Sequence, residues 1–100
     1  MRVERLVGLY VTDDDGYRKY REGMLPILEM FGGGFSYDFK VSEVLKSEVK
    51  EKINRVFIIY FKNEESMNLF FSNKDYVDIK EKYFVSSVSE VTEIAKYETK

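Results

Sequence analysis

The sequence predicts an α+β fold with the element order β-α-β-β-α-β, which is the ferredoxin-like arrangement of a four-stranded antiparallel sheet with helices on one face. Two observations predict it. Along the chain, strand-like and helix-like spacings of apolar residues succeed one another in that order. The first and third strand segments are apolar on both faces, as central strands are, whereas the second and fourth are mixed in polarity, as edge strands are. With 100 residues, the chain has room for one domain, residues 1–100.

The first strand and the first helix are predicted from the N-terminal third of the chain. Residues 6–11, LVGLYV, are apolar on both alternating faces, and Thr12 or Asp13 can cap the helix that follows. From Tyr17 to Phe31, apolar residues recur at helical spacing and charged residues turn outward. Pro26 lies inside this pattern and predicts a kink or a break, because proline lacks an N–H and crowds the preceding turn.

Three consecutive glycines, Gly32 to Gly34, raise the question of a phosphate site. They follow a helix and precede a strand, which is the reverse of the order in a P-loop, and no Gly-Lys-Ser/Thr is present. The glycines are therefore interpreted as a helix C-cap, with Gly32 or Gly33 in the left-handed region, and a flexible entry into the next strand.

The second strand alternates aromatic and polar residues. Phe35, Tyr37 and Phe39 are expected to line one face of this edge strand. Asp38 is expected on the opposite, solvent-exposed face.

The second half of the chain repeats the strand and helix pattern. The charged stretch Lys46–Lys52 is interpreted as a hairpin connection, and Arg55–Phe61 as a second strand that is apolar on both faces. Asn63 is the expected N-cap of a helix, which is followed after a short interruption by a second, shorter one. A final strand of mixed polarity is expected from Val88 to Tyr97.

The composition excludes several kinds of chemistry. The chain has no Cys and no His, so disulfides, thiolate nucleophiles, Cys/His zinc sites and histidine-ligated haem are excluded. No metal site and no cofactor are predicted. The net charge of −2 gives no electrostatic basis for nucleic-acid binding. The N-terminal apolar run is too short to span a membrane, so a cytoplasmic protein without membrane contact is expected.

A homodimer is predicted from the polarity of the central strands. Two helices can cover only one face of a four-stranded sheet, yet the central strands are apolar on both faces. A bare apolar face of that size exceeds what soluble monomers usually expose. The expected partner is a second copy of the chain, packed sheet to sheet about a two-fold axis.

Candidate ligand-binding residues are an arginine and several tyrosines. Arg55 opens a core strand, and its guanidinium needs an anionic partner, which could be Glu43, Asp38 or a bound ligand. Tyr10, Tyr20, Tyr37 and Tyr60 could line a pocket between sheet and helices, because tyrosine combines apolar area with one polar group. Core packing alone explains these tyrosines equally well. The residues retained as candidates for ligand binding are Tyr37, Arg55, Tyr10 and Tyr20, and no catalytic residue is identified.

Three segments, YRKYREGMLPILEMFGGGF, INRVFIIYF and FFSNKDY, resemble the domain-of-unknown-function family DUF1330. The matching positions share the family's tyrosine-rich first helix with an internal proline, its Phe-Gly-Gly turn, the arginine that leads the third strand and an aromatic segment after the second helix. They are Tyr17, Tyr20, Pro26, Phe31, Gly32, Gly33, Arg55, Phe70, Phe71, Asp75 and Tyr76. The chain departs from the family in lacking an arginine in the second strand, where it has SYDF, and another near Tyr83.

The family resembles the dimeric α+β barrel superfamily, which implies a homodimer but no particular reaction. The resulting expectation is a small-molecule pocket between helices and sheet in an uncharacterised homodimer. The pocket would hold an aromatic compound, and the protein could act on it as a cofactor-independent monooxygenase or isomerase. Tyr37 and Arg55 would orient the substrate. The alternative is a non-enzymatic ligand-binding or assembly module. A cavity of about 300 Å³ or more beside Tyr37 and Arg55 would favour the first.

Overall fold

A computed structural model describes residues 1–100 and contains the predicted elements in the predicted order. The strands are β1 (Arg2–Val11), β2 (Gly34–Lys40), β3 (Arg55–Phe61) and β4 (Val88–Thr99). The helices are α1 (Asp14–Met30), α2 (Glu64–Ser72), α3 (Lys74–Ile79) and α4 (Val85–Ser87), and a single π-helical turn, η1 (Lys80–Phe84), joins the last two. None of the helices combines the length and apolar character needed to cross a bilayer.

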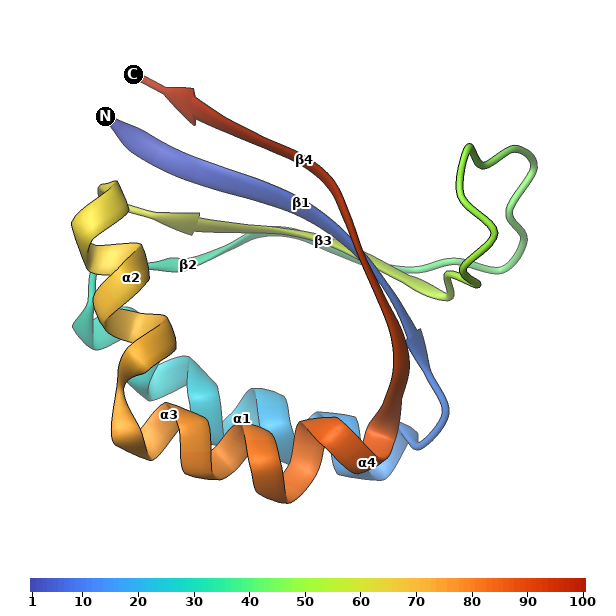
Figure 1. Cartoon of the computed structure of the whole chain (residues 1–100), viewed down its shortest axis with the longest axis horizontal. Coiled ribbons are helices and arrows are strands. Elements are labelled where there is room, and N and C mark those ends of the chain that lie inside the picture. The colour runs from blue at the N-terminus through green and yellow to red at the C-terminus, as the bar shows by residue number, and fades with distance from the viewer.

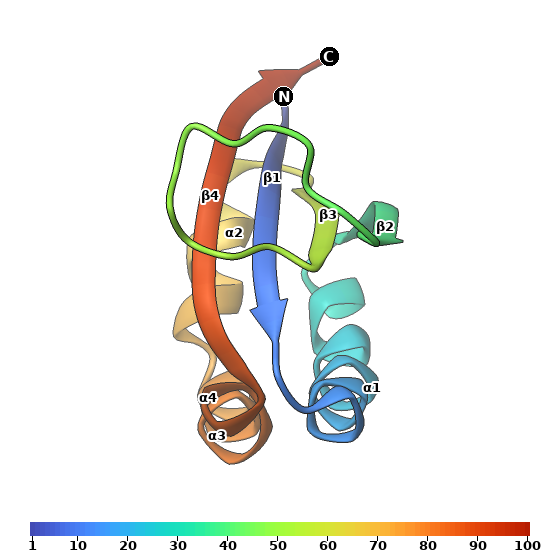
Figure 2. The same cartoon turned by 90° about the vertical axis from the view of Figure 1, so that its right-hand side faces the viewer.

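The four strands form one antiparallel sheet in the order β2-β3-β1-β4. This order confirms that the first and third strands are central. All helices lie on the same side of the sheet, and α1 runs beside the segment from α3 to α4 (Figure 1, Figure 2). We call the covered side the helix face and the other side the open face.

The helix α1 begins and ends as the sequence indicates. Asp13 is its N-cap and accepts a hydrogen bond from the Gly16 N–H at 3.1 Å. After the last turn, Gly32 adopts a left-handed conformation with φ of 75°, and the Gly33 N–H donates to the Leu28 carbonyl at 2.9 Å. This is a Schellman cap, which confirms the interpretation of the glycines as a helix stop.

Pro26 does not break α1, because the helix continues from Asp14 to Met30. The other alternative, a kink, stays a prediction. The proline lies on the exposed side of the helix. The carbonyl of Glu22, which loses its usual donor, therefore faces solvent and can bond to water.

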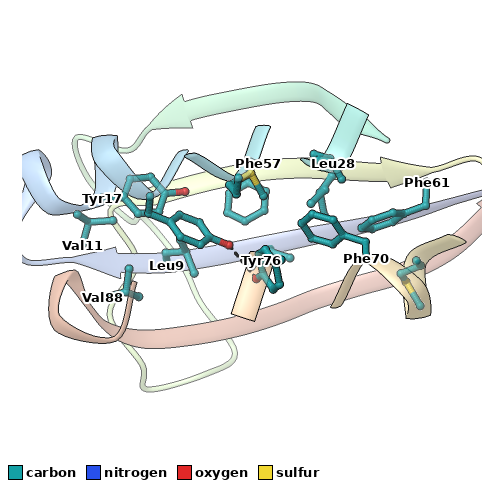
Figure 3. Packing of buried hydrophobic residues seen from close by; sticks show 14 of the residues in the cluster. Leu9, Val11, Tyr17, Leu28, Phe57, Phe61, Phe70, Tyr76 and Val88 are labelled. Carbon is teal, nitrogen blue, oxygen red and sulfur yellow. Dashed lines mark hydrogen bonds between the residues drawn. The ribbon is translucent and has the colours of Figure 1, made fainter. Parts of the chain in front are cut away.

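The core lies between the helix face and the helices, and aromatic residues dominate it (Figure 3). Leu9 of β1 and Phe61 of β3 are completely buried, as are Tyr17 and Leu28 of α1 and Phe70 of α2. Phe70 packs against the rings of Phe61 and Tyr76, with centroid separations of 5.7 Å and 4.3 Å. Such rings contribute more stabilisation than their buried area alone gives.

A β-bulge at Ser36 overturns the expected orientation of the second strand. Phe35 pairs with Ile59, but Tyr37 pairs with Ile58, so Ser36 has no partner on β3. The bulge reverses the faces of the residues that follow it. Phe35 therefore packs on the helix face, whereas Tyr37 and Phe39 lie on the open face, where they are 57% and 54% exposed. The expectation that these three aromatic residues share one face is wrong.

Asp38 is also placed differently from the expectation. It pairs with Phe57, whose side chain lies on the helix face, so the Asp38 side chain points the same way. There its carboxylate forms an ion pair with Arg21 of α1 at 2.9 Å. Asp38 thus connects β2 to α1, although its side chain remains partly exposed.

Candidate functional site

A cavity of about 140 Å³ lies between the sheet and the helices. Its walls are apolar and largely aromatic. They are formed by Val7 and Leu9 of β1, Phe35 of β2, Phe57 and Ile59 of β3, Tyr17, Tyr20 and Met24 of α1, Phe71, Tyr76 and Phe84 of the later helices, and Val91 of β4. Three cationic residues, Arg5, Arg21 and Lys80, complete the lining, and no Asp or Glu contributes to it.

Two tyrosine hydroxyls meet in the cavity wall. The Oη atoms of Tyr20 and Tyr76 are 2.9 Å apart, and the bond between them is buried (Figure 3). One hydroxyl must donate to the other, so one of the two hydrogens remains free for a further acceptor. A polar pair of this kind gives the otherwise apolar cavity a fixed point for orienting a ligand.

Both hydroxyls stay protonated at physiological pH. Burial raises the pKa of Tyr20 far above its ordinary value of 10.0, and the adjacent Tyr76 hydroxyl adds to the rise. Burial likewise raises the pKa of Tyr76. Neutral tyrosines can donate and accept hydrogen bonds, but they cannot act as general bases near neutral pH.

Arg21 is held rigidly at one side of the cavity. It donates one hydrogen bond to the Tyr17 hydroxyl and one to the Asp38 carboxylate, both at 2.9 Å. Its guanidinium also lies over the ring of Phe35, 3.7 Å from the centroid. Burial raises the pKa of Tyr17, an effect that the positive charge of Arg21 partly offsets.

Arg5 lies at the side of the cavity next to β4. Its Nε and Nη2 atoms donate to the same oxygen of Glu93 at 3.0 Å and 2.7 Å, and its guanidinium lies 5.2 Å from the centre of the Phe71 ring. The lining residues Val91 of β4 and Lys80 of η1 are exposed, so the cavity opens to solvent where these elements line it. Arg5 thus combines a fixed orientation with access from solvent.

The residues predicted from sequence to bind a ligand lie in three separate places. Tyr20 is in the cavity wall. Tyr37 lies on the open face, and so does Tyr10, whose neighbours Leu9 and Val11 point to the core. Arg55 lies on the helix face but outside the cavity. The structure therefore does not bring Tyr37 and Arg55 together.

Arg55 has a different partner from those considered. Its Nη2 atom lies 3.3 Å from Oδ1 of Asp14, and its guanidinium lies 5.0 Å from the centre of the Tyr17 ring. A wide surface hollow of about 390 Å³ adjoins it, but polar and charged side chains dominate the lining and Tyr37 is not among them. The expected pairs with Glu43 and Asp38 do not form.

The cationic residues of the cavity were missed because they resemble surface charges in the sequence. Arg21 stands among other charged residues of α1, and Arg5 lies in a charged stretch at the N-terminus with Arg2 and Glu4. Their partners are far along the chain, with Asp38 17 residues from Arg21 and Glu93 88 residues from Arg5. The position of Arg5 in the strand was the one signal in the sequence. Arg5 lies two residues from Val3 and from Val7, which are both buried, so its side chain points to the same face of the sheet.

Comparison with known proteins finds one family and several similar structures. Residues 6–97 match the model of the family described as "Domain of unknown function (DUF1330)". No curated protein matches the sequence.

The similar structures share the fold at low sequence identity. A Rhodopseudomonas palustris protein of unknown function has a TM-score of 0.78 at 16% identity, over 96% of this chain and 80% of that one. A Mesorhizobium loti protein described as a dabb family protein with a ferredoxin-like fold has a TM-score of 0.64 at 13% identity, covering 98% of this chain and 96% of that chain. A Jannaschia protein of unknown function, described as dimeric and ferredoxin-like, has a TM-score of 0.62 at 11% identity, over 99% of this chain and 100% of that one.

Proposed function

The chain belongs to the DUF1330 family, and we propose that it binds a small molecule with one aromatic ring and an acidic group in the cavity between sheet and helices. The observation that carries the proposal is the hydroxyl pair of Tyr20 and Tyr76 inside an aromatic cavity, between two fixed arginines. The family is one of unknown function, so it does not define the ligand. The size of the cavity and the polar groups around it define the ligand instead.

The size of the cavity sets the size of the ligand. A volume of about 140 Å³ is smaller than the roughly 300–1,000 Å³ of pockets for drug-sized molecules. It is close to the engineered apolar cavity of about 150 Å³ in another protein that holds benzene. A single ring therefore fits, whereas a fused polycyclic compound does not.

The polar groups set the chemistry of the ligand. The aromatic walls favour a flat ring, and the free hydrogen of the hydroxyl pair favours an acceptor such as a phenolic or carboxylate oxygen. Glu93 neutralises Arg5 and Asp38 neutralises Arg21, but no ion pair engages Lys80. The open end thus carries a net positive charge, and an anionic substituent is preferred there.

Binding is best tested with a matched series of ligands by calorimetry or NMR titration. Benzoate and 4-hydroxybenzoate should bind more tightly than benzyl alcohol, toluene or cyclohexanecarboxylate. Replacing Arg5 by Gln should weaken benzoate binding by about 10-fold, since it leaves the Glu93 carboxylate without its counter-charge beside the anionic ligand. Arg18→Gln is the matched control, because Arg18 is exposed on α1 and pairs only with Asp15 and Glu22. Equal affinity for toluene and benzoate, or no binding at all, would contradict the proposal.

Catalysis by cofactor-independent oxygenation or isomerisation is a second candidate function. The specific observation in its favour is the set of cations beside an aromatic cavity, which would stabilise a phenolate formed by the substrate itself. In the oxygenation, a quinol would supply the electrons, one atom of O₂ would enter the ring and the other would leave as water. Because no carboxylate lines the cavity, a substrate without an acidic proton of its own should not react.

An oxygen electrode tests the catalytic proposal directly. Small quinols should consume oxygen faster with the protein than without it, and Arg5→Gln should reduce the difference. If a panel of single-ring quinols shows neither oxygen uptake nor rearrangement above the uncatalysed rate, this catalytic proposal is refuted.

We also propose that the chain forms a homodimer through the open face. Leu6, Val56 and Ile58 lie on this face, and the large side chains of Tyr37 and Phe39 extend it. Apolar residues grouped on one exposed sheet face favour a protein partner. Structures from Jannaschia and Bacteroides fragilis with similar folds are described as dimeric. Sedimentation velocity at micromolar concentration should give a dimer, and a clean monomer would refute it.

The cytoplasmic location stays a prediction that cell fractionation would test.

A further inference from the structure

We propose that residues 41–54, the connection between β2 and β3, form an arm that clasps a second copy of this chain. The inference rests on the proposed dimer through the open face and adds the segment that completes its interface. Figure 1 shows the arm projecting from the sheet on the side opposite the helices, and Figure 2 shows it passing in front of β1 and β4.

The base of the arm is fixed to the sheet. The Asn54 side chain accepts a hydrogen bond from the Val11 N–H at 2.7 Å and donates one to the Val11 carbonyl at 2.8 Å. Its backbone N–H donates to the Leu9 carbonyl at 2.8 Å. Ile53 packs on Gly8, where a Cβ atom would lie only 2.9 Å from Ile53 Cδ1. The arm therefore leaves the sheet from a defined position and in a defined direction.

The tip of the arm has no such support. Within residues 42–50, the only hydrogen bonds join Ser47 and Val49. Leu45 is 89% exposed, and Val44 and Val49 are exposed as well. Large apolar side chains on an unsupported tip are unfavourable in water unless another surface covers them.

A groove of about 710 Å³ separates the arm from its own sheet. Apolar side chains line it from both sides, with Val44, Leu45 and Val49 on the arm and Val56 and Ile94 on the open face. The arm and the groove belong to the same face of the same chain. About a two-fold axis, each copy can therefore cover the other's arm and receive the other's surface in its groove.

The area required for a stable dimer favours a second copy as the occupant. With strands about 4.8 Å apart and about 3.3 Å per residue, four strands over seven paired positions present a footprint of only roughly 450 Å². Stable interfaces bury about 800 Å² on each partner. The sheet face alone is smaller than this. The exposed apolar side chains of the arm can add the remaining interface area.

The charges of the arm tip are also consistent with a second copy. Residues 42–50 contain two glutamates and two lysines, Glu43, Glu48, Lys46 and Lys50, so their charges cancel. A neutral tip has no attraction for nucleic acid or for an anionic membrane. Two such tips can approach each other without electrostatic repulsion.

Two variants and one labelling measurement test the arm. Leu45→Asp should weaken the dimer at least 10-fold in sedimentation equilibrium, because it places a charge in the covered apolar contact. Leu69→Asp is the matched control, since Leu69 is exposed on α2 on the other side of the molecule. In hydrogen exchange, the amides of residues 43–50 should be protected in the wild-type dimer and exchange freely in an open-face variant such as Ile58→Asp. Tyr37→Glu serves the same purpose if Ile58→Asp does not fold.

The outcomes separate the arm from the dimer on which it rests. If the wild type is dimeric and neither Leu45→Asp nor hydrogen exchange shows an involvement of the arm, the proposed role of the arm is refuted. The proposal of a sheet-to-sheet dimer then stands. A monomeric wild type overturns both. If Leu45→Asp dissociates the dimer but Ile58→Asp and Tyr37→Glu do not, the arm joins copies through another surface, and the open-face dimer is overturned.

Discussion

The two faces of the sheet use the same strands for opposite purposes. On the helix face, Val7 and Leu9 of β1 and Phe57 of β3 meet the chain's own helices in a core whose cavity has room for about one aromatic ring. On the open face, Tyr37 and Phe39 have no cover within the chain. The difference is the basis of our proposal that the helix face serves folding and ligand binding, whereas the open face serves assembly.

Truncation of a core aromatic residue should have the largest effect and should be confined to the helix face. Phe61→Ala should reduce the free energy of unfolding by about 3–5 kcal/mol, because Phe61 is fully buried among other rings. Phe39→Ala, measured below the dissociation constant of any dimer, should cost less than about 1 kcal/mol. Urea denaturation of both variants checks this, and similar losses would erase the distinction between the faces.

A charge at the centre of the open face should have the second-largest effect. Ile58→Asp should weaken the proposed dimer about 100-fold, since it requires a carboxylate to be buried against the partner. The far-ultraviolet circular dichroism of the variant should remain that of the wild type, because the Ile58 side chain lies outside the core. Sedimentation velocity over a concentration series measures the shift, and an unchanged dimer would show that the open face is not the interface.

The hydroxyl pair in the cavity should contribute a smaller amount. Tyr20→Phe or Tyr76→Phe alone should cost about 1–2 kcal/mol, because each leaves a buried hydroxyl without its partner. The double variant should lose less than the sum of the two single losses. A double-mutant cycle in urea gives this coupling. Strict additivity would mean that the two hydroxyls do not interact.

The effect of alkaline pH follows from the raised pKa values of these tyrosines. In the unfolded chain they ionise near 10, whereas in the folded chain burial keeps them neutral to higher pH. Stability should therefore be fully present below about pH 10 and fall as the pH rises above it, because only the unfolded state releases the protons. Denaturation at about pH 8 and pH 11 measures the loss, and the Tyr20→Phe/Tyr76→Phe variant should show a smaller one. An equal loss in both proteins would assign the effect to other groups.

The fold was predictable because its signals are local or periodic. The apolar character of β1 and β3 on both faces identified them as the central strands, and the glycines after α1 identified its end. Asp13 and Asn63, each followed by acidic residues, identified the starts of two helices.

The candidate site was predictable only in part, because its geometry depends on pairing between distant segments. Tyr20 follows from helical spacing and lies in the cavity. The placement of Tyr37 required knowledge of the bulge at Ser36, which arises from the register between β2 and β3 and has no signature in the alternating residues themselves. Arg5 and Arg21 acquire their roles only once β4 and β2 bring Glu93 and Asp38 beside them.

The unpaired Ser36 has a practical consequence for comparing this chain with its relatives. If a relative without the bulge is aligned with FSYDF letter for letter and without a gap, every residue after Phe35 is matched with one on the other side of the sheet. The residue matched with Asp38 would then lie on the open face, and the residue matched with Tyr37 would lie on the helix face. Residues of this strand should therefore be matched by superposition of coordinates, because an alignment of letters alone exchanges the helix face with the open face.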